Sequence, residues 1–388
     1  MSRLHVTGSG VVLDLIRSGI TTRRELTDHL GWSRVTIGRR LTELLAVGLI
    51  IPDGSLASGG GRPRESFAVN KDAGVLLAAD IGSSHTQVGV TDLVSNVLTA
   101  SHADIGLYDG PEEIFRWAGQ VFDFLLAKVG RTRDDVLGIG IGVPGPVDHR
   151  TGTLGVSQFD PRWDGVPVPR WVGDWGRSDA VVAVDRDVNI LALGESRLGW
   201  PDANDLVVVK AGMGIGCAFV VDGRLVRGAR GGSGQLSAPL RERLSDPLRR
   251  LETVASGATV GDQLTQAGHH VHTGVDLVAV VASGDRAART AVDEAAAQLG
   301  YALADVVGLL NPTAVVIGGA LAELGEQFVA VVRRSLFAAS HAFARQGLIV
   351  ERNRLGQDAG IRGASLLAQD RLFDADRISE LTRTLDPA

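Results

Sequence analysis

From residue 74 onward, short apolar runs recur along the chain, and most end in a turn rich in glycine, proline or aspartate. Residues 75–79 lead into a turn at 80–84, and residues 206–209 lead into a glycine-rich turn at 211–216. Runs of this length bounded by turn residues are typical of buried strands. With helical stretches such as 190–198 between them, they predict an α/β fold.

Three of these turns are candidate phosphate loops. They lie at residues 80–84, at 211–216, and after an apolar strand that ends at Gly318-Gly319. Glycine lets backbone approach a ligand closely, so the loops together would surround a nucleotide. Taken singly, each is weak evidence, because aspartate and glycine are ordinary turn residues. The candidate phosphate-loop residues are Asp80, Gly82, Ser83, Ser84, Gly212, Gly214, Gly318 and Gly319.

The first seventy residues show a different pattern, of three short amphipathic helices. Thr22 and Glu25 have the spacing of a capping box, Gly31 makes a turn, and Ser33 can cap a third helix. That helix has Ile37, Leu41 and Leu44 on one stripe. Three helices with a glycine turn before the third predict a helix-turn-helix, whose third helix enters the major groove of DNA. A small helical bundle with a solvated basic face is the alternative.

The opposite face of the third helix is basic, and a wing is expected after it. Strands at 50–51 and 66–69 would flank a tip at 58–64 in which Pro63 holds two arginines extended. Arginine can read guanine, threonine can meet a thymine methyl, and an Arg-Pro-Arg element fits a narrow minor groove. A flexible linker would explain the tip equally. The candidate DNA-binding residues are Ser33, Arg34, Thr36, Arg39, Arg40, Arg62 and Arg64.

Charge and cysteine content narrow the class of protein. Residues 1–70 carry nine arginines against six acidic residues, while the whole chain has a net charge of −6. A basic head on an acidic body suits a DNA-binding module joined to another domain, although chance scatter would also produce it. Cys217 is the single cysteine, which excludes a disulfide within the chain and a cysteine zinc site. No signal core follows the N-terminus, and Asp305 and Asn311-Pro312 break the most apolar stretch, so we expect a cytoplasmic protein without membrane segments.

Several longer motifs are more specific than the single turns. They read GVPGPVD at 142–148, WDGVP at 163–167, LETVASG at 251–257, and NPTAVVIGG at 311–319, with GGRP at 60–63. In this order they resemble the ROK (repressor, open reading frame, kinase) family of bacterial sugar kinases and sugar-responsive repressors. The resemblance runs from about residue 8 to about residue 370. Family repressors carry the N-terminal winged helix and the Gly-Gly-Arg-Pro segment, and kinases lack this head.

The resemblance implies a fold and a division into domains. A winged helix-turn-helix over residues 1–70 would precede a two-lobed, actin-like and sugar-kinase-like module. The first lobe would span 74–185 and the second 186–375, with the C-terminal helix able to pack back on the first lobe. In this superfamily each lobe begins with a carboxylate followed by glycine at a hairpin turn, and the resemblance implies that Asp80 would hold a magnesium-bound water.

Several positions depart from the family pattern. The first loop usually reads Asp-x-Gly-Gly-Thr-Lys, and here Ser83 and His85 stand in it. The family's acid-base pair Asn-Asp is Arg186-Asp187, and Gly-Glu-Ile-Gly-His has become GQLSA at 234–238, ending in Ala238. The zinc cysteines are absent, and His269, His270 and His272 are expected to be exposed, so no metal site is predicted. The candidate ligand-binding residues are Arg186, Asp187, Gln235 and Glu252.

These departures argue against phosphoryl transfer, which depends on several groups acting together. Asp187 matches the kinase aspartate, yet it also suits a helix N-terminus. The sequence therefore predicts a DNA-binding regulator, a repressor of carbohydrate genes, with no enzymatic activity and no cofactor. Its partners would be operator DNA, a sugar or sugar phosphate, and a second copy in a homodimer or dimer of dimers. The alternatives are an ATP-dependent sugar kinase with a regulatory head, and a regulator that has lost ligand binding.

Overall fold

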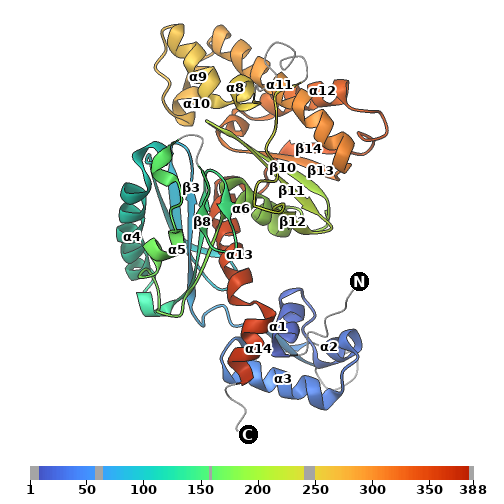
Figure 1. Cartoon of the computed structure of the whole chain (residues 1–388). Helices are drawn as coiled ribbons and strands as arrows, with labels where there is room; N and C mark the ends of the chain where they lie inside the picture. Colours follow the sequence, from blue (N-terminus) through green and yellow to red (C-terminus); the bar gives the residue numbers. More distant parts are fainter. Residues whose placement is uncertain (1–7, 57–63, 157–159, 240–249, 384–388) are drawn as a thin grey trace.

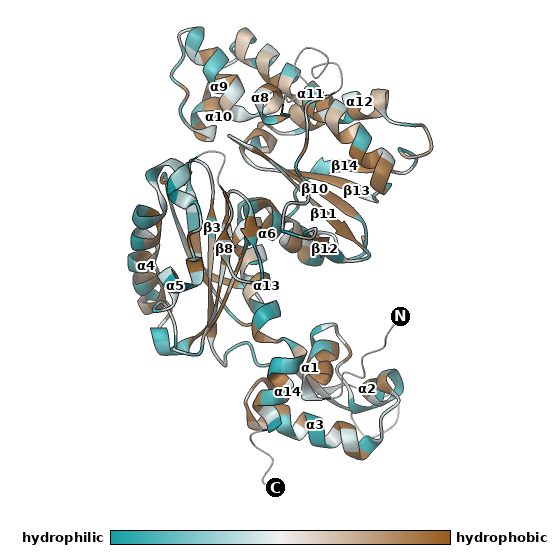
Figure 2. Cartoon of the chain, in the orientation of Figure 1, coloured by the Kyte–Doolittle hydropathy of each residue, from teal (hydrophilic) through white to brown (hydrophobic). Residues whose placement is uncertain are grey.

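A computed structural model describes residues 8–56, 64–156, 160–239 and 250–383 (Figure 1). The chain forms a small head, two α/β lobes and a C-terminal helical segment that returns to the head. The strands of both sheets are predominantly apolar and lie inside their lobes, as the hydropathy colouring shows (Figure 2). Within the described ranges, no helix is long and apolar enough to cross a membrane.

The head is a three-helix unit with a two-stranded wing. Its elements are α1 (Ser9–Arg17), α2 (Arg23–Leu30), α3 (Arg34–Ala46), β1 (Ile50–Leu56) and β2 (Arg64–Val69). The predicted capping box forms between Thr22 and Glu25, Gly31 is left-handed at the end of α2, and the Ser33 side chain caps α3. The antiparallel pair β1–β2 has the register Ile50 opposite Val69. The winged helix-turn-helix fold predicted for this segment is therefore confirmed.

The first lobe is built on a sheet with strand order β5-β4-β3-β6-β9. Its strands are β3 (Val75–Ile81), β4 (Thr86–Thr91), β5 (Val97–Ala103), β6 (Val136–Val143) and β9 (Val181–Arg186). Two helices, α4 (Pro111–Lys128) and α5 (Val168–Val172), and the short hairpin β7 (Val147–Asp148) to β8 (Thr153–Leu154) contribute to this lobe. The core between the sheet and α4 is aromatic, with Phe115 and Phe122 against Trp163 and Trp175.

The second lobe repeats the plan of the first. Its sheet has the order β12-β11-β10-β13-β14, again a hairpin meander on one side and parallel strands on the other. The strands are β10 (Leu206–Ala211), β11 (Ile215–Val221), β12 (Arg224–Val226), β13 (Ala314–Gly318) and β14 (Ile349–Arg352). One face is covered by α8 (Glu252–Ala255), α9 (Gly257–Gln266), α10 (Gly274–Ala282), α11 (Arg286–Leu310) and α12 (Glu326–Ala339). The other face packs on α6 (Asp187–Gly194), which ends in a π-helical turn at Glu195–Gly199.

Two C-terminal helices connect the lobes to the head. Helix α13 (Ala359–Leu372) packs on α6 and on β3, β6 and β9 of the first sheet, and α14 (Ala375–Arg383) packs on α1 (Figure 1). The contacts are tight because glycines meet backbone. A methyl on Gly363 would lie 1.7 Å from the Ile190 carbonyl oxygen, and one on Gly10 would lie 2.2 Å from the Ala375 carbonyl oxygen. The division into residues 1–70, 74–185 and 186–375 stays a prediction, and all of α14 except its first residue lies beyond the third segment.

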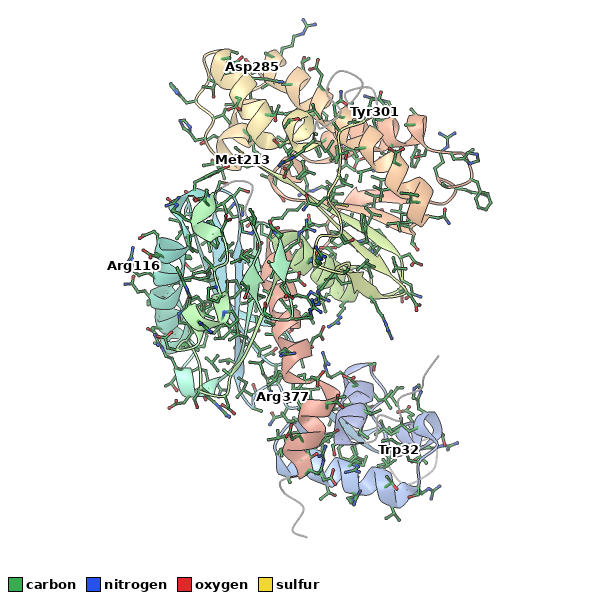
Figure 3. The ribbon with its side chains drawn as sticks, in the orientation of Figure 1. Trp32, Arg116, Met213, Asp285, Tyr301 and Arg377 are labelled. Atoms are coloured by element: carbon green, nitrogen blue, oxygen red, sulfur yellow. The ribbon has the colours of Figure 1, made fainter. Side chains whose placement is uncertain are left out.

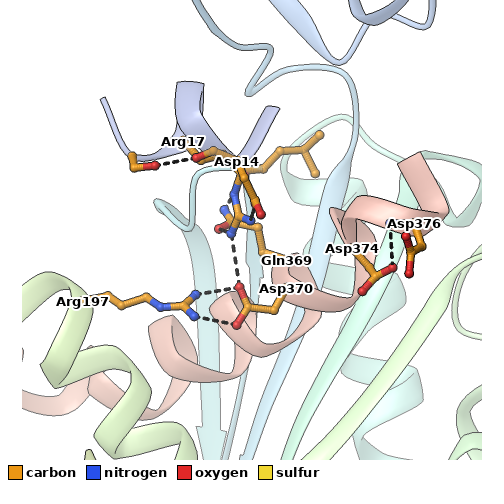
Figure 4. A network of polar contacts seen from close by, with 9 residues as sticks. Asp14, Arg17, Arg197, Gln369, Asp370, Asp374 and Asp376 are labelled. Carbon is orange, nitrogen blue, oxygen red and sulfur yellow. Dashed lines mark hydrogen bonds and ion pairs between the residues drawn. The ribbon is translucent and has the colours of Figure 1, made fainter. Parts of the chain in front are cut away.

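A shared hydrophobic cluster and an ionic junction join the head to the body. Leu372, Phe373 and Ile378 are buried in the same cluster as Leu13 of α1 and Leu76 of β3. At the surface of this cluster, the Asp370 carboxylate accepts two hydrogen bonds of 2.7 Å from Arg197 of the π-helical turn (Figure 4). The same carboxylate pairs with Arg17 of α1 at 3.2 Å. Asp370 on α13 thus contacts both the end of α6 and the head.

Candidate functional site: a cleft between two lobes and a basic head

The predicted phosphate loops are brought together where the two lobes face each other, a region that we call the cleft. A methyl on Gly214 would lie 3.8 Å from Ser83 Oγ, so the first and second loops face each other. One on Gly212 would lie 3.9 Å from the Ala320 amide nitrogen, beside the third loop. Gly319 has φ +88°, and a methyl there would lie 2.6 Å from the Ala211 carbonyl oxygen, so only glycine fits. Met213, at the tip of the second loop, lies at the edge of its lobe that faces the first lobe (Figure 3).

Part of the loop backbone is already bonded within the protein. The Gly82 amide donates to the His85 carbonyl (2.8 Å), and the Gly212 amide donates to the Gly214 carbonyl (2.9 Å). The Gly212 and Met213 carbonyls accept from the first two amides of α9, at 2.7 and 3.1 Å. The second loop is therefore fixed to α9, and the Gly82 and Gly212 amides are engaged in their own turns. Ser84 lies half-buried in the first loop, and Gly318 is buried at the end of β13.

The strongest charge interaction in the cleft involves Lys210, at the end of β10. Its ammonium lies 3.0 Å from Asp80 Oδ1 and 3.1 Å from Asp187 Oδ2. All three side chains are largely buried. Burial disfavours the ammonium, but the charges of Asp187 and Asp80 outweigh it and raise the pKa of Lys210. Lys210 is therefore a permanent cation between the two carboxylates that the sequence analysis singled out.

The neighbours of Asp187 form a second group of polar residues. Arg186 is buried and donates to the Ser233 carbonyl, and Asp187 begins α6 as predicted. Glu252 Oε1 accepts from the Ile215 amide at 3.3 Å. Burial raises the pKa of Glu252, and the Ile215 amide only partly opposes this. A methyl on Gly214 would also lie 3.5 Å from Glu252 Oε1, which places this carboxyl beside the second loop.

The segment that matches the family's sugar and zinc motif lies farther along the second lobe. Gln235 is exposed and Ala238 is buried. Of the three clustered histidines, His269 pairs with Asp285 at 3.4 Å, and the His272 amide donates to Asp276. Among the residues whose positions are described, no group of three histidine, cysteine or acidic side chains could hold a metal ion. A role for Gln235 in ligand binding stays a prediction.

The head presents a basic face on α3. Arg34, Val35 and Arg39 are exposed. Among the large apolar side chains that the structure describes, only Leu309, at 84%, is more exposed than Val35, at 83%. Arg39 is 55% exposed and lies 3.6 Å from Glu43, whereas Arg40 is only 20% exposed and bonds Glu43 at 3.0 and 3.1 Å. Arg40 is thus held in a structural ion pair. The Ser33 and Thr36 hydroxyls bond each other at 2.9 Å.

Only the backbone of one of the two predicted wing arginines, Arg64, is described by the structure. Arg62 lies outside the described residues, and Arg64 begins β2 with its side chain also outside them. DNA contacts by the seven candidate residues of the head stay a prediction. Val35 and Lys210 were not among the site residues predicted from the sequence. A signal for Lys210 existed, because Lys210-Ala211-Gly212 repeats the spacing of Asp80-Ile81-Gly82.

The fold and the cleft define a protein with a two-lobed, sugar-kinase-like module and a head of the DNA-binding winged type. The chain belongs to the ROK family, whose model matches residues 76–371. It is 25% identical over 375 residues to the xylose repressor of Caldicellulosiruptor bescii, covering 91% of this chain and 92% of that one. It is 36% identical over 303 residues to the bifunctional enzyme NanE/NanK of Brucella suis, covering 77% of this chain and 54% of the enzyme.

A solved structure extends the likeness of fold to the head. The crystal structure of a ROK family transcriptional regulator, described as a homologue of the E. coli MLC protein, superimposes with a TM-score of 0.78. It is 23% identical and covers 97% of this chain and 98% of its own. The fold predicted from the sequence, a winged head followed by a two-lobed ROK module, is confirmed.

The kinase branch of this fold implies a magnesium ion and a nucleotide, and the cleft does not fit the metal. Magnesium in phosphoryl-transfer enzymes is held by one or two carboxylates together with phosphate oxygens and water. Here the ammonium of Lys210 contacts Asp80, which was expected to hold a magnesium-bound water, and also Asp187, which matches the kinase aspartate. A divalent cation at either carboxylate would lie against a fixed positive charge.

Proposed function

We propose that the protein is a DNA-binding transcriptional regulator, and specifically a repressor of carbohydrate genes. The observation that carries the proposal is the exposed arginine face of α3, on a head that α14 attaches to the ROK module. The match to the xylose repressor supports it, because the aligned region covers nearly the whole of both chains. Arg34 and Arg39 are the side chains that we expect to contact DNA first.

We further propose that a sugar or sugar derivative in the cleft controls the head through α13. This helix begins beside the cleft, since a methyl on Gly360 would lie 2.1 Å from Asp80 Oδ2. It has 14 residues, which corresponds to about 21 Å, and its last turns carry Gln369, Asp370 and Leu372 into the junction with the head. A ligand that binds one lobe arrangement better than another shifts the population toward it.

The ligand contacts would come from the polar residues around Asp187. Asp187 and Glu252 can accept hydrogen bonds from sugar hydroxyls, and Gln235 can do so if the ligand extends toward it. Arg186 already donates to the Ser233 carbonyl, so we expect it to shape the pocket. Two copies of the chain in the cytoplasm would place their heads on half-sites one helical turn apart or a multiple of it.

The test is selection of DNA by the full chain. Genomic fragments that the protein binds are sequenced and shortened to a single binding site. The affinity of the protein for this site is then measured by gel shift with and without common sugars. We expect a sequence-specific site whose occupancy one sugar changes, and lower affinity in Arg34→Ala. Absence of any preferred sequence at physiological salt would refute the proposal. Light scattering of the complex reports whether a dimer binds.

An active sugar kinase is the second candidate, and two observations favour it. Asp80 and Asp187 are both present at the cleft, and the bifunctional enzyme of Brucella suis aligns with 77% of the chain. ATP consumption is therefore measured over hexoses and amino sugars. Turnover that disappears in Asp187→Ala would establish this activity, whereas no turnover with any sugar would leave the regulator as the supported function.

A further inference from the structure

Lys210 and Asp80 occupy equivalent places in the two lobes. Each is the last residue but one of the central strand of its sheet, and each is followed two residues later by the first glycine of a loop. Asp80 lies opposite Gly142 on the neighbouring parallel strand, and Lys210 lies opposite Gly318 in the same way. The repeated architecture therefore aims one negative and one positive side chain at each other across the cleft.

The pair is completed and enclosed by other elements. Asp187 at the start of α6 supplies the second carboxylate, 3.1 Å from the Lys210 ammonium. Behind Asp80, the backbone of α13 at Gly360 leaves no room for a side chain. Glu252 lies near enough to Asp187 for the charge of Asp187 to help raise the pKa of Glu252. His85 of the first lobe lies close enough to Lys210, Asp80 and Asp187 for their charges to act on its pKa, and Asp104 lies near His85.

These contacts leave the two carboxylates poorly suited to a metal. Magnesium demands a nearly regular set of oxygen ligands and usually shares a site with phosphate oxygens. Lys210 is a compact point charge with three donors, and it uses them on oxygens that a metal would need. Its ammonium stays protonated at neutral pH because the carboxylates surround it.

We propose that Lys210 is an internal cation that takes the place of a divalent metal in this cleft. It neutralises Asp80 and Asp187, joins the two lobes directly, and makes ligand binding independent of metal and of metal-bound nucleotide. This inference rests on the proposed function as a regulator, because a regulator needs a ligand-dependent lobe arrangement and no phosphoryl transfer. It predicts that removing one charge, at residue 210, creates a metal site at Asp80 and Asp187.

The test follows Mn²⁺ binding to the full chain by the electron paramagnetic resonance signal of free Mn²⁺, with and without ATP. Five chains are compared: the natural protein, Lys210→Ala, Asp80→Asn, the combination of these two changes, and Lys128→Ala as a control at an exposed lysine of α4. We expect the natural protein and the control to bind no Mn²⁺ in the cleft. Lys210→Ala should bind one equivalent at least tenfold more tightly than the double variant.

Folding of each variant is checked by circular dichroism and by thermal unfolding with and without Mn²⁺. If Lys210→Ala does not fold, Lys210→Gln keeps two donors without the charge and serves in its place. The proposal is overturned if the natural protein binds Mn²⁺ in a manner lost in Asp80→Asn, or if a folded residue-210 variant gains no binding. DNA selection is scored separately on the natural protein, so failure of the regulator proposal and failure of the metal prediction give different results.

Discussion

Two glycine-to-alanine changes in the head are expected to alter stability in opposite directions. Gly10 in α1 and Gly38 in α3 are both helical, so alanine gains about 0.5–1 kcal/mol of helix stability at either, and less in the first turn where Gly10 lies. Their surroundings differ. A methyl on Gly10 would meet three backbone atoms of Ala375 at 2.2–2.7 Å, whereas one on Gly38 would meet only the end of the Arg23 side chain at 3.3 Å.

The clash at Gly10 can be relieved in two ways, and each has a similar cost. If the helices are forced apart, overpacking typically costs about 1–3 kcal/mol. If α14 leaves instead, the burial of Ile378 is lost, which costs about 1.5–3 kcal/mol. Because either cost exceeds the gain in helix propensity, Gly10→Ala should destabilise the head by about 1–2 kcal/mol. Gly38→Ala should stabilise it by about 0.5–1 kcal/mol, since the arginine tip can move.

Urea unfolding and amide hydrogen exchange measure the two effects. We expect faster exchange in α1 and α14 of Gly10→Ala, with the second lobe unchanged, and slower exchange in α3 of Gly38→Ala. Equal stability of the two variants, or unchanged protection of α14 in Gly10→Ala, would show that α14 is not packed on α1 as described.

Four further outcomes are expected. Asp370→Asn should lower the protection of α1 in hydrogen exchange and lower the free energy of unfolding by about 1 kcal/mol, because each half-exposed ion pair contributes little. Unchanged protection of α1 would show that Asp370 does not hold the head to the body. Arg39→Ala should weaken DNA binding in a gel shift and reduce the slope of log affinity against log salt concentration by about 1. Arg40→Ala should mainly lower the stability of the head in urea unfolding. A loss of DNA binding in Arg40→Ala with a loss of stability in Arg39→Ala would contradict the roles given to the two arginines. We expect the exposed side chain of Val35 to contact a thymine methyl, which deoxyuridine lacks. Replacing thymine by deoxyuridine in the selected site should therefore weaken DNA binding by up to about fourfold in the natural protein but not in Val35→Ala. Since the pKa of Glu252 is raised in the folded state, this state binds the Glu252 proton more tightly than the unfolded state does. The free energy of unfolding should therefore rise as the pH falls toward 4.5. Urea unfolding of Glu252→Gln over this pH range should show a smaller rise, because the contribution of Glu252 is absent.

The head could be predicted well because its signals are local. Thr22 with Glu25, Gly31 and Ser33 each act on a turn that lies within three or four residues of them, and the structure has every one of these caps. The strand partners Ile50 and Val69 are joined by a short connection. The glycine-rich turns predicted that the phosphate loops would surround a nucleotide together, although no local pattern shows which strands become neighbours.

The parts that escaped prediction depend on contacts between distant segments. Lys210 and Asp80 are 130 residues apart, and only the repeated sheet plan brings them together. Helix α14 has an apolar stripe, but nothing near it in the sequence identifies α1 as its partner. The ion pair of Arg40 with Glu43 likewise depends on tertiary packing. Glu43 is oriented by Ser9 of α1 as well as by the arginines of its own helix.

The contact between α1 and α14 also has a consequence for how the protein is made. The Gly10 amide and the Ser379 hydroxyl that meet there are separated by 369 residues, so the ribosome synthesises both lobes before it supplies the helix that covers α1. Domains generally fold as units in the order of synthesis. Here α1 is made early, but α14, which covers it, is made much later. A chain released before α14 was made would carry a head with its apolar side uncovered. The head is therefore completed only after both lobes have been translated.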